Sequence, residues 1–292
     1  IGKSHRTNDT SDMLMFNAEE SGIVVKFEKK DTPQKVNIKL FRQGPKDIRL
    51  NDTKISQKEL IGTLNTVIFC PEDLQLIKGT PSGRRRFLDM EISQTSATYY
   101  HQLMQYNRLL QQRNAVLKEY RGKQNIPLEE WDLQLADMAS FIVKKRLESL
   151  KKINLLIDLM NRKLTGGLEN LTIGYEQPYM DNGSLEYTKE GFYERIKAAL
   201  PQDRHRMTTS VGPHRDDLRF FSDSMDLKKF GSQGQQRTAV LSLKLSELEF
   251  IKSEVGEYPV LLLDDVLSEL DESRRANLLQ FIHKRIKTFI TT

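Results

Sequence analysis

The order of apolar and polar positions along the chain predicts an α/β protein whose first part is built from strands. Apolar and polar residues alternate between residues 22 and 55, with breaks at Asp31-Thr32-Pro33 and at Gly44-Pro45. This alternation indicates an antiparallel meander. The stretch of residues 65–71 is short and almost entirely apolar, as expected of a buried central strand that ends at a proline.

Two long helical patterns follow. Between about residues 95 and 120, apolar residues recur at near-heptad spacing without glycine or proline, and a polar break at 121–127 ends the pattern. In a second run, apolar residues recur every three or four positions from Ala139 to Leu164, and the pattern ends at Gly166-Gly167. The pattern predicts an antiparallel helical hairpin that stands out as an arm or lobe, with an ordinary helical subdomain as the alternative.

The last part of the chain alternates between strand-like and helix-like patterns. A long helix is predicted from about Ser232, because leucines and an isoleucine line one of its faces. Four apolar residues after Pro259 indicate a strand buried on both faces. The other predicted elements are a strand at 170–176, a helix at 185–200 and a strand at 217–223.

The start of the helix at Ser232 has two interpretations. The Ser232 hydroxyl can cap the helix by accepting a hydrogen bond from a first-turn N–H. The same turn, flanked by Gly231 and Gly234, can also hold a phosphate, because unpaired N–H groups and the positive end of the helix dipole attract anions. The turn alone does not decide between them.

Asp264 and Asp265 stand at the carboxyl end of the predicted strand 260–263. Ligands of open α/β sheets bind at such ends. Successive strand residues point to opposite sides, so we expect different roles. One acid can hold a hydrated Mg²⁺ on a triphosphate, and the other can orient an attacking water. The alternative is that two adjacent acids merely end the strand.

Composition narrows the class of protein. The 292 residues allow two domains, and 45 Lys+Arg against 40 Asp+Glu permit a nucleic-acid partner without proving one. The single cysteine, Cys70, excludes a disulfide framework and a four-thiolate metal site, which favours the cytoplasm. We find no long apolar run and no signal peptide, so we expect no membrane partner. Both ends of the sequence suggest a piece of a longer protein.

Three motifs in order carry a resemblance to a known class. "GSQGQ" before a helix, then "LLLDD", then "SELD" resemble the signature motif, Walker B motif and D-loop of ABC-type ATPases. Within that class the sequence resembles the RecF family of bacterial recombination mediators, from residue 3 to the last residues. The further stretches that carry this likeness are "PEDLQLIKGTPSGRRRFLD", "GPHRDDLRF" and "GSQGQQRT".

The resemblance implies an ABC-type ATPase head, with a mixed sheet, an antiparallel meander and an inserted helical hairpin lobe. Residues 1–90 and 206–292 would form the ATPase domain, and residues 91–205 the helical arm. ATP and Mg²⁺ would be its cofactors. ATP held between two copies would stabilise a dimer and couple hydrolysis to its opening.

The resemblance also implies roles for particular residues. Asp264 would bind Mg²⁺, and Asp265, where relatives carry a glutamate, would position or activate the water. The residues that would touch the γ-phosphate of ATP held by a second subunit are Ser232, Gly234 and Gln235. Ser268 and Asp271 would cross the same dimer interface.

Two departures from the class pattern matter. No G-x-x-x-x-G-K-[ST] loop occurs in the sequence; we expect it to precede Ile1, so that the chain from Ile1 onward binds ATP poorly. Many ABC ATPases also carry a histidine where "ITT" stands and a glutamine where "CPEDL" stands. Thr291 or Thr292, and Glu72 or Asp73, would substitute for them, or the roles are absent, and we expect slow turnover.

The resemblance implies double-stranded DNA near single-strand gaps as a partner, with RecR and RecO as helpers in RecA loading and DNA-stimulated ATP hydrolysis. Clustered cations suit phosphate contacts, whereas the single Trp131 gives little sign of a stacking platform. The alternative is that each cluster is a solvated face, or that the arginines pair with Glu72 and Asp73. The predicted DNA-binding residues are Lys78, Arg84, Arg85, Arg86, Lys144, Lys145 and Arg146.

Smaller signals and other functions complete the predictions. His214, Asp216 and Asp217 are too close in sequence to converge easily on one metal, so we expect them to organise a turn near the nucleotide. His5 and Arg6 are expected beside the nucleotide.

Two other functions are the alternatives to a recombination mediator. One is a transporter nucleotide-binding subunit, and the other is a structural DNA-binding protein with a vestigial nucleotide site. DNA-stimulated ATP hydrolysis separates the three functions.

Overall fold

The computed structural model describes residues 9, 11–121, 127–179, 187–283 and 285–291. They form two compact units, Ile1–Thr66 and Val67–Thr292. His5, Arg6 and Thr292, for which the sequence predicted roles near the nucleotide, lie outside the described residues. Within the described ranges, no helix is long and apolar enough to cross a membrane.

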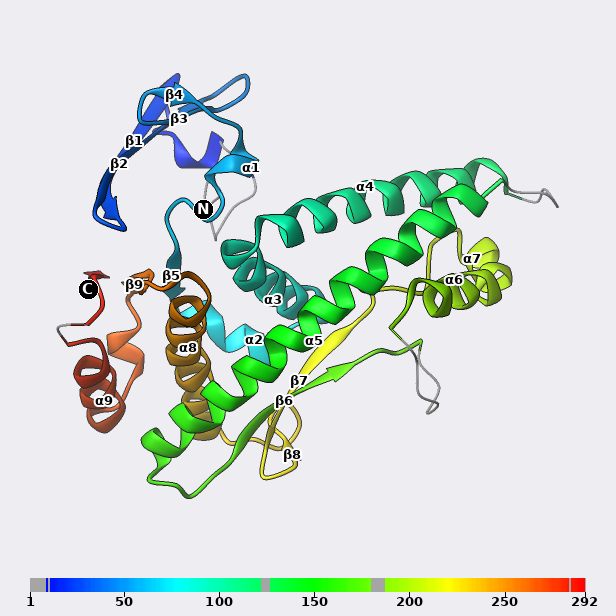
Figure 1. The fold of residues 1–292 in the computed structure, drawn as a ribbon. Helices are drawn as coiled ribbons and strands as arrows, with labels where there is room; N and C mark the ends of the chain where they lie inside the picture. The colour runs from blue at the N-terminus through cyan, green and yellow to red at the C-terminus, as the bar shows by residue number, and fades with distance from the viewer. Residues whose placement is uncertain (1–8, 10, 122–126, 180–186, 284, 292) are drawn as a thin grey trace. The chain divides into compact units, whose positions relative to one another are not determined.

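The first unit contains the antiparallel meander that the alternating pattern predicted (Figure 1). The hairpin between its first two strands turns at Lys30 and Asp31, which both have positive φ, of 47° and 58°. Two such residues are typical of the turn whose twist matches paired strands. The predicted break lay slightly late, because Thr32 and Pro33 already belong to the second strand. The strands, in sheet order, are β1 (Glu20–Lys29), β2 (Thr32–Phe41), β3 (Asp47–Leu50) and β4 (Thr53–Lys54).

A small core holds this unit together. Val36 and Ile48 of the sheet pack with Leu60 of the short helix α1 (Gln57–Leu60). Ser56 caps α1 in a reciprocal capping box with Glu59. A 3₁₀ turn, η1 (Ser11–Met13), precedes the sheet.

In the second unit, one sheet has the order β10-β9-β5, formed by β5 (Thr66–Phe69), β9 (Val260–Asp264) and β10 (Thr288–Thr291). Among the described residues, β9 is the central strand of this sheet and β5 lies at its edge, so a central place for the strand at 65–71 stays a prediction. Leu261 and Leu263 of β9 are 1% exposed, whereas Leu262 between them is only half-buried. Only one face of β9 is thus fully buried, not two as predicted.

A second sheet has the order β6-β7-β8 and is antiparallel throughout. Its strands are β6 (Leu171–Glu176), β7 (Asp217–Ser222) and β8 (Met225–Asp226). The first two agree with the predicted strands. The long helix α5 packs against β6 (Figure 1).

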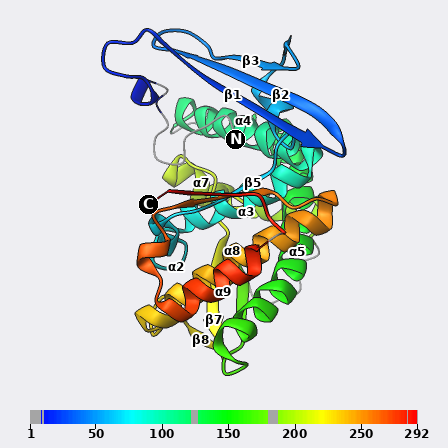
Figure 2. The same ribbon diagram turned by 90° about the vertical axis from the view of Figure 1, so that its left-hand side faces the viewer.

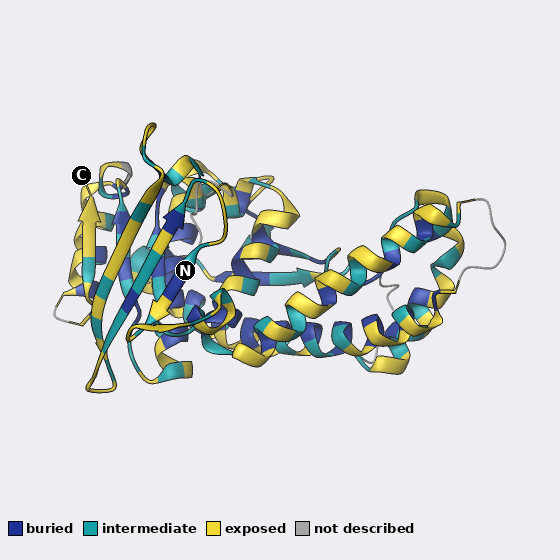
Figure 3. Cartoon of the chain, turned by 90° about the horizontal axis from the view of Figure 1, so that it is seen from above, coloured by how far each residue is buried: buried dark blue, intermediate teal, exposed yellow. Residues whose placement is uncertain are grey.

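The predicted helical hairpin is present as α4 (Ala97–Glu119) and α5 (Glu129–Thr165). α5 begins ten residues earlier than the apolar pattern suggested, with acids in its first turn that favour a helix start. It ends at Gly166, which adopts a left-handed φ of 68°. Buried and exposed residues alternate along both helices (Figure 3).

The helix predicted at 185–200 corresponds to α6 (Lys189–Ala198), and a second helix, α7 (Leu200–Arg206), which was not predicted, follows it. The break between α6 and α7 has a local cause, because Pro201 stands in the first turn of α7, where a missing N–H is tolerated. The remaining helical segments are η2 (Pro71–Leu74), α2 (Gln75–Lys78), α3 (Pro81–Thr95), η3 (Leu267–Glu269) and α9 (Glu272–Ile282).

The helix α8 (Gln233–Val255) is the centre of the second unit. The sequence predicted one apolar face, but most α8 residues from Gln236 to Ile251 are buried, so the helix is covered on nearly every side. α5 packs along it, and both helices contribute to one continuous apolar core. The compact units divide after Thr66, and the division predicted at residues 90/91 and 205/206 stays a prediction.

Candidate functional site

The helix α8 starts with a reciprocal cap at Ser232. The Ser232 hydroxyl accepts a hydrogen bond from the Gln235 N–H at 3.2 Å, and the Gln235 amide oxygen accepts one from the Ser232 N–H at 3.0 Å. This is the cap that one interpretation predicted. Ser232 is also exposed, as an anion site at this helix start requires. The observed cap and a phosphate site can therefore share one geometry.

The two glycines of this turn differ in what the fold requires of them. A Cβ at Gly231 would lie 2.6 Å from the Leu227 carbonyl oxygen, so close packing excludes a side chain there. A Cβ at Gly234 would meet no atom of the described residues closer than 3.8 Å. Glycine inside a helix costs about 1 kcal/mol relative to alanine. The described fold therefore does not explain why residue 234 is a glycine.

The carboxyl end of β9 brings Asp264 beside Thr291 of β10. The parallel register pairs the two residues, and the Thr291 hydroxyl donates a hydrogen bond to an Asp264 carboxylate oxygen at 2.8 Å. The same hydroxyl accepts a hydrogen bond from the Asp265 N–H at 3.2 Å. Thr291, one of two threonines expected in the place of a histidine, thus contacts the acid predicted to hold the metal.

Asp265 lies in a turn rather than in the strand. β9 ends at Asp264, and Asp265 has a left-handed φ of 53°. The argument from strand alternation therefore does not apply to Asp265, whose direction is set by this turn. The Ser268 hydroxyl lies 2.8 Å from the Asp265 carbonyl oxygen and 3.1 Å from its carboxylate. Asp265 and Ser268 are both exposed, and their side chains lie next to each other.

Asp271 is the N-cap of α9. Its carboxylate accepts a hydrogen bond from the Arg274 N–H at 2.9 Å and forms an ion pair with the Arg274 guanidinium. The hydrogen bond from the Arg274 N–H lowers the pKa of Asp271, so this carboxylate is ionised at neutral pH. The guanidinium also reaches α8, where its Nε donates to the Thr238 hydroxyl at 2.9 Å. The sequence analysis did not single out Arg274; its place one turn after "SELD" was the available signal.

Asp73, one of two acids expected in the place of a glutamine, is used inside the fold. Its carboxylate accepts a hydrogen bond from the Cys70 N–H at 2.9 Å and lies 3.2 Å from the Lys244 ammonium of α8. Burial raises the pKa of the Cys70 thiol to about 12. Glu72 is exposed. Asp73 therefore links this segment to α8, and the glutamine-like role remains a prediction for Glu72.

The partner of Asp73 belongs to a buried charge cluster that the sequence analysis missed. Lys244 is also 3.2 Å from the Glu247 carboxylate, and Glu91 of α3 interacts electrostatically with both. Burial raises the pKa of Glu91 to about 7 and raises that of Glu247 as well, while Lys244 opposes both shifts. One ammonium thus faces three carboxylates, and the excess of negative charge favours a bound proton.

Two of the predicted DNA-binding arginines are not available to DNA. Arg84 is 3% exposed, and its Nε and Nη2 donate to the Asp217 carboxylate at 2.7 and 2.8 Å. Arg146 is 2% exposed and pairs with Asp89 at 2.8 Å. A buried, paired guanidinium cannot reach a phosphate without leaving its carboxylate uncompensated. The prediction is wrong for both, as is the alternative pairing of Arg84 with Glu72 or Asp73.

The other predicted cations are more accessible. Arg85 is half-buried and donates to the Asp216 carbonyl oxygen at 2.6 Å, and Lys145 lies 3.4 Å from the Glu148 carboxylate. Three exposed cations remain, and their contact with DNA stays a prediction: Lys78, Arg86 and Lys144.

The "PHRDD" segment forms a polar network instead of a metal site. Asp216 is 0% exposed and accepts a hydrogen bond from the Tyr179 hydroxyl at 2.6 Å and another from the Tyr175 hydroxyl. Its carboxylate also lies 3.5 Å from Arg146. The described part of the chain contains no cluster of three potential metal-ligating side chains. The segment therefore joins α5 to the β6–β7 sheet.

His214 of this segment is a structural residue. Its Nε2 lies 3.0 Å from the Thr209 carbonyl oxygen, which can only accept, so Nε2 carries the proton. Nδ1 then accepts a hydrogen bond from the Tyr106 hydroxyl at 2.6 Å. Burial lowers the pKa of His214 to about 4. The imidazole is therefore neutral at pH 7 and joins α4 to the segment before β7.

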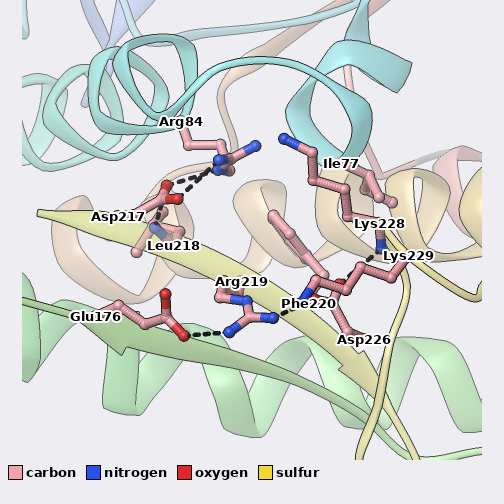
Figure 4. A pocket seen from close by; sticks show the side chains of 10 residues that line it. All are labelled: Ile77, Arg84, Glu176, Asp217, Leu218, Arg219, Phe220, Asp226, Lys228 and Lys229. Atoms are coloured by element: carbon pink, nitrogen blue, oxygen red, sulfur yellow. Dashed lines mark hydrogen bonds and ion pairs between the residues drawn. The ribbon is translucent and has the colours of Figure 1, made fainter. Parts of the chain in front are cut away.

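A pocket of about 280 Å³ lies beside β7 and β8, but its arginines already have partners (Figure 4). Arg84 is paired with Asp217, and Arg219 bonds Glu176 at 2.6 Å and also Asp226. Of the residues predicted near the nucleotide, Asp217 lines it, and its carboxylate is occupied by Arg84. Ser232, Asp264 and Asp265, which are predicted to act on the nucleotide, lie at the start of α8 and at the carboxyl end of β9 rather than in this pocket.

The chain was compared with known proteins. No protein-family model matches it. The "DNA replication and repair protein RecF" of Alkaliphilus oremlandii is 45% identical over 294 residues, which cover 100% of this chain and 80% of the relative. The protein of the same description from Clostridium botulinum (strain Eklund 17B / Type B) is 44% identical over 292 residues, with the same coverage.

Solved structures agree with the curated relatives. The structure described as "recombination mediator protein RecF-ATPrS in RecFOR pathway" matches with a TM-score of 0.91 at 35% identity, covering 100% of this chain and 80% of that chain. An Smc head bound to a domain of ScpA matches with a TM-score of 0.51 at 13% identity, covering 98% and 72%, which shows the fold alone. The fold is that of an ABC-type ATPase head, and the chain belongs to the RecF family.

Proposed function

We propose that the protein is an ATP-dependent recombination mediator that forms dimers around bound ATP. Two solved structures of the same family are described as RecF-ATP and RecF-ATPrS of the RecFOR pathway. ATPase activity is the general function that these relatives support. We further infer that this activity is weak and stimulated by DNA.

The start of α8 carries the dimer proposal. Ser232 faces outward at the positive end of a long helix, and Gly234 lacks a side chain that the described fold would accommodate. A γ-phosphate supplied by a second subunit would use both features, because it needs N–H donors and a close approach of the backbone. Gln235 completes the turn through its bond to the Ser232 N–H.

The carboxyl end of β9 carries the proposed chemistry. Asp264 would hold Mg²⁺, which requires oxygen ligands. Asp265, turned out of the strand by its left-handed φ, would orient the attacking water. Ser268 would fix Asp265 through the contacts described above. Thr291 would orient Asp264 in place of a histidine.

DNA binding by the exposed cations is the remaining element of the proposal. Lys78, Arg86 and Lys144 are accessible and can approach phosphates, with Arg85 and Lys145 as partly covered neighbours. Contacts of this kind position a protein on DNA without reading its sequence. RecO and RecR would be its partners in loading RecA at gaps, in the cytoplasm. The transporter alternative has no support among the compared relatives.

One experiment tests the proposal as a whole. The full-length protein is mixed with ATP, Mg²⁺ and a gapped duplex, and its mass and rate of ATP hydrolysis are measured. We expect an ATP-dependent dimer and faster hydrolysis with DNA. A protein that stays monomeric with ATP would refute the dimer, and hydrolysis unaffected by DNA would refute the coupling.

A further inference from the structure

One side chain connects the two segments that are proposed to face the second subunit. Arg274, in the first turn of α9, pairs with Asp271 through Nη1 and donates from Nε to the Thr238 hydroxyl of α8 at 2.9 Å. Its Nη2 lies 3.4 Å from the Gly234 carbonyl oxygen. α9 runs beside α8 in both side views (Figures 1 and 2).

The two α8 residues that Arg274 contacts are also bonded to each other. Thr238 is 3% exposed and donates its own hydroxyl proton to the Gly234 carbonyl oxygen at 2.9 Å. Gly234 and Thr238 are therefore held by each other and by the same guanidinium. A guanidinium is a rigid fork with five donors, so it can bind a carboxylate and a helix turn at once. A lysine ammonium in the same place is a point charge and cannot span both.

The stability of α9 itself does not explain this arrangement. A cation in the first turn of a helix lies near the positive end of the helix dipole, where it is unfavourable. Asp271 already caps α9 through the Arg274 N–H, which any residue except proline would supply at position 274. The side chain of Arg274 therefore acts mainly between the two helices.

We propose that Arg274 is a positioning residue that fixes the Ser232–Gly234 turn and Asp271 as one rigid surface for the second subunit. The inference rests on the proposed ATP-dependent dimer. Surfaces that are ordered before they meet bind more tightly, because less freedom is lost on association. Without Arg274 the two segments would have to be ordered separately when the dimer closes.

The test compares two neighbouring arginines in the full-length protein. Arg274→Gln removes the bridge to α8. Arg275→Gln removes the same charge from a side chain whose guanidinium, among the described residues, bonds its own segment at the Leu270 carbonyl oxygen. We expect Arg274→Gln to weaken the ATP-dependent dimer about tenfold or more, as loss of charge-assisted hydrogen bonds would. Arg275→Gln should change it little, and Arg274→Lys should restore it only in part.

Two further readouts separate positioning from a general loss of structure. ATP affinity of the monomer and the melting temperature should stay close to the unsubstituted protein in both variants. Hydrogen exchange of the amides in the first two turns of α8, measured without ATP, should be faster only in Arg274→Gln. If the unsubstituted protein forms no dimer with ATP, the proposed function fails and this inference with it. If it does, and both variants dimerise and exchange alike, the inference alone is overturned.

Discussion

The Thr291 hydroxyl of β10 donates a hydrogen bond to the carboxylate of Asp264 at 2.8 Å. Asp264 lies on β9, the parallel strand that pairs with β10. This contact links Thr291, which is proposed to replace a histidine, to the proposed metal ligand. It predicts that the hydroxyl, rather than the size of the side chain, matters for catalysis.

Thr291→Val keeps the shape of the side chain but removes the hydroxyl. We expect the Mg²⁺ concentration needed for half-maximal ATP hydrolysis to rise about tenfold, because partners that orient metal ligands contribute to this extent. Thr291→Ser, which keeps the hydroxyl, is the control and should behave like the unsubstituted protein. Equal metal dependence of all three proteins would show that the contact has no role in metal binding.

Asp265→Asn should slow ATP hydrolysis about a hundredfold and prolong the lifetime of the dimer, since a group that activates water would be lost. Asparagine is the suitable substitution, because it also tolerates the left-handed φ of 53° at this position. Single-turnover hydrolysis and size-exclusion chromatography with ATP measure the two effects. An unchanged lifetime of the dimer would mean that another group positions the water.

Substitutions at Ser232 separate the cap from the phosphate site. Ser232→Ala removes the cap and should cost about 1 kcal/mol of stability, with a weakened dimer. Ser232→Arg should abolish the ATP-dependent dimer while the monomer keeps its nucleotide affinity, since the residue would act on ATP of the other subunit. Loss of nucleotide binding by the monomer would argue against that assignment.

The buried acid Glu91 predicts an unusual pH dependence of stability. Its pKa is about 7 in the folded protein and 4.5 ordinarily, so between these values the folded state binds more protons than the unfolded state. The free energy of unfolding should therefore fall as pH rises through this window, by up to about 1.4 kcal/mol per pH unit. Urea unfolding at several pH values measures it. Glu91→Gln should flatten the slope, and an unaltered slope would assign the proton elsewhere.

Arg84 and Arg86 of α3, two residues apart, should respond differently to the same substitution. Arg84→Gln leaves Asp217 without its buried partner and should destabilise the fold by about 3 kcal/mol, with the salt dependence of DNA binding unchanged. Arg86→Gln, at an exposed position, should leave stability unchanged and reduce the salt slope by about one. Thermal unfolding and a salt titration of DNA binding test both. Identical behaviour of the two variants would contradict the distinction between them.

The sequence predicted those elements whose signals are local. The meander, the hairpin helices and the cap of α8 follow from apolar spacing and from residues within a few positions of each other. The place of β5 beside β9 at the edge of the described sheet could not be predicted, because strand order depends on which distant strands pair. The start of α7 also had a local signal, Pro201, which lies directly after the end of the predicted helix.

The site was predicted in its residue types but not in its contacts. Arg84 looked like part of an exposed cluster because its partner, Asp217, is 133 residues away. Arg146 likewise meets Asp89 and Asp216 at separations of 57 and 70 residues. The direction of Asp265 depended on a backbone turn that strand alternation does not describe. Charge alone could not tell a solvated arginine from a buried one.

The network around Asp216 limits how this protein can be recombined with its relatives. Arg146 comes from the helical hairpin, while Tyr175 and Asp216 come from the sheet side. Removing any one of them would leave a buried charge or hydroxyl without its partner. A chimaera that grafts a foreign hairpin onto this head would need the matching acid and tyrosine as well. These positions are therefore expected to be inherited as a set.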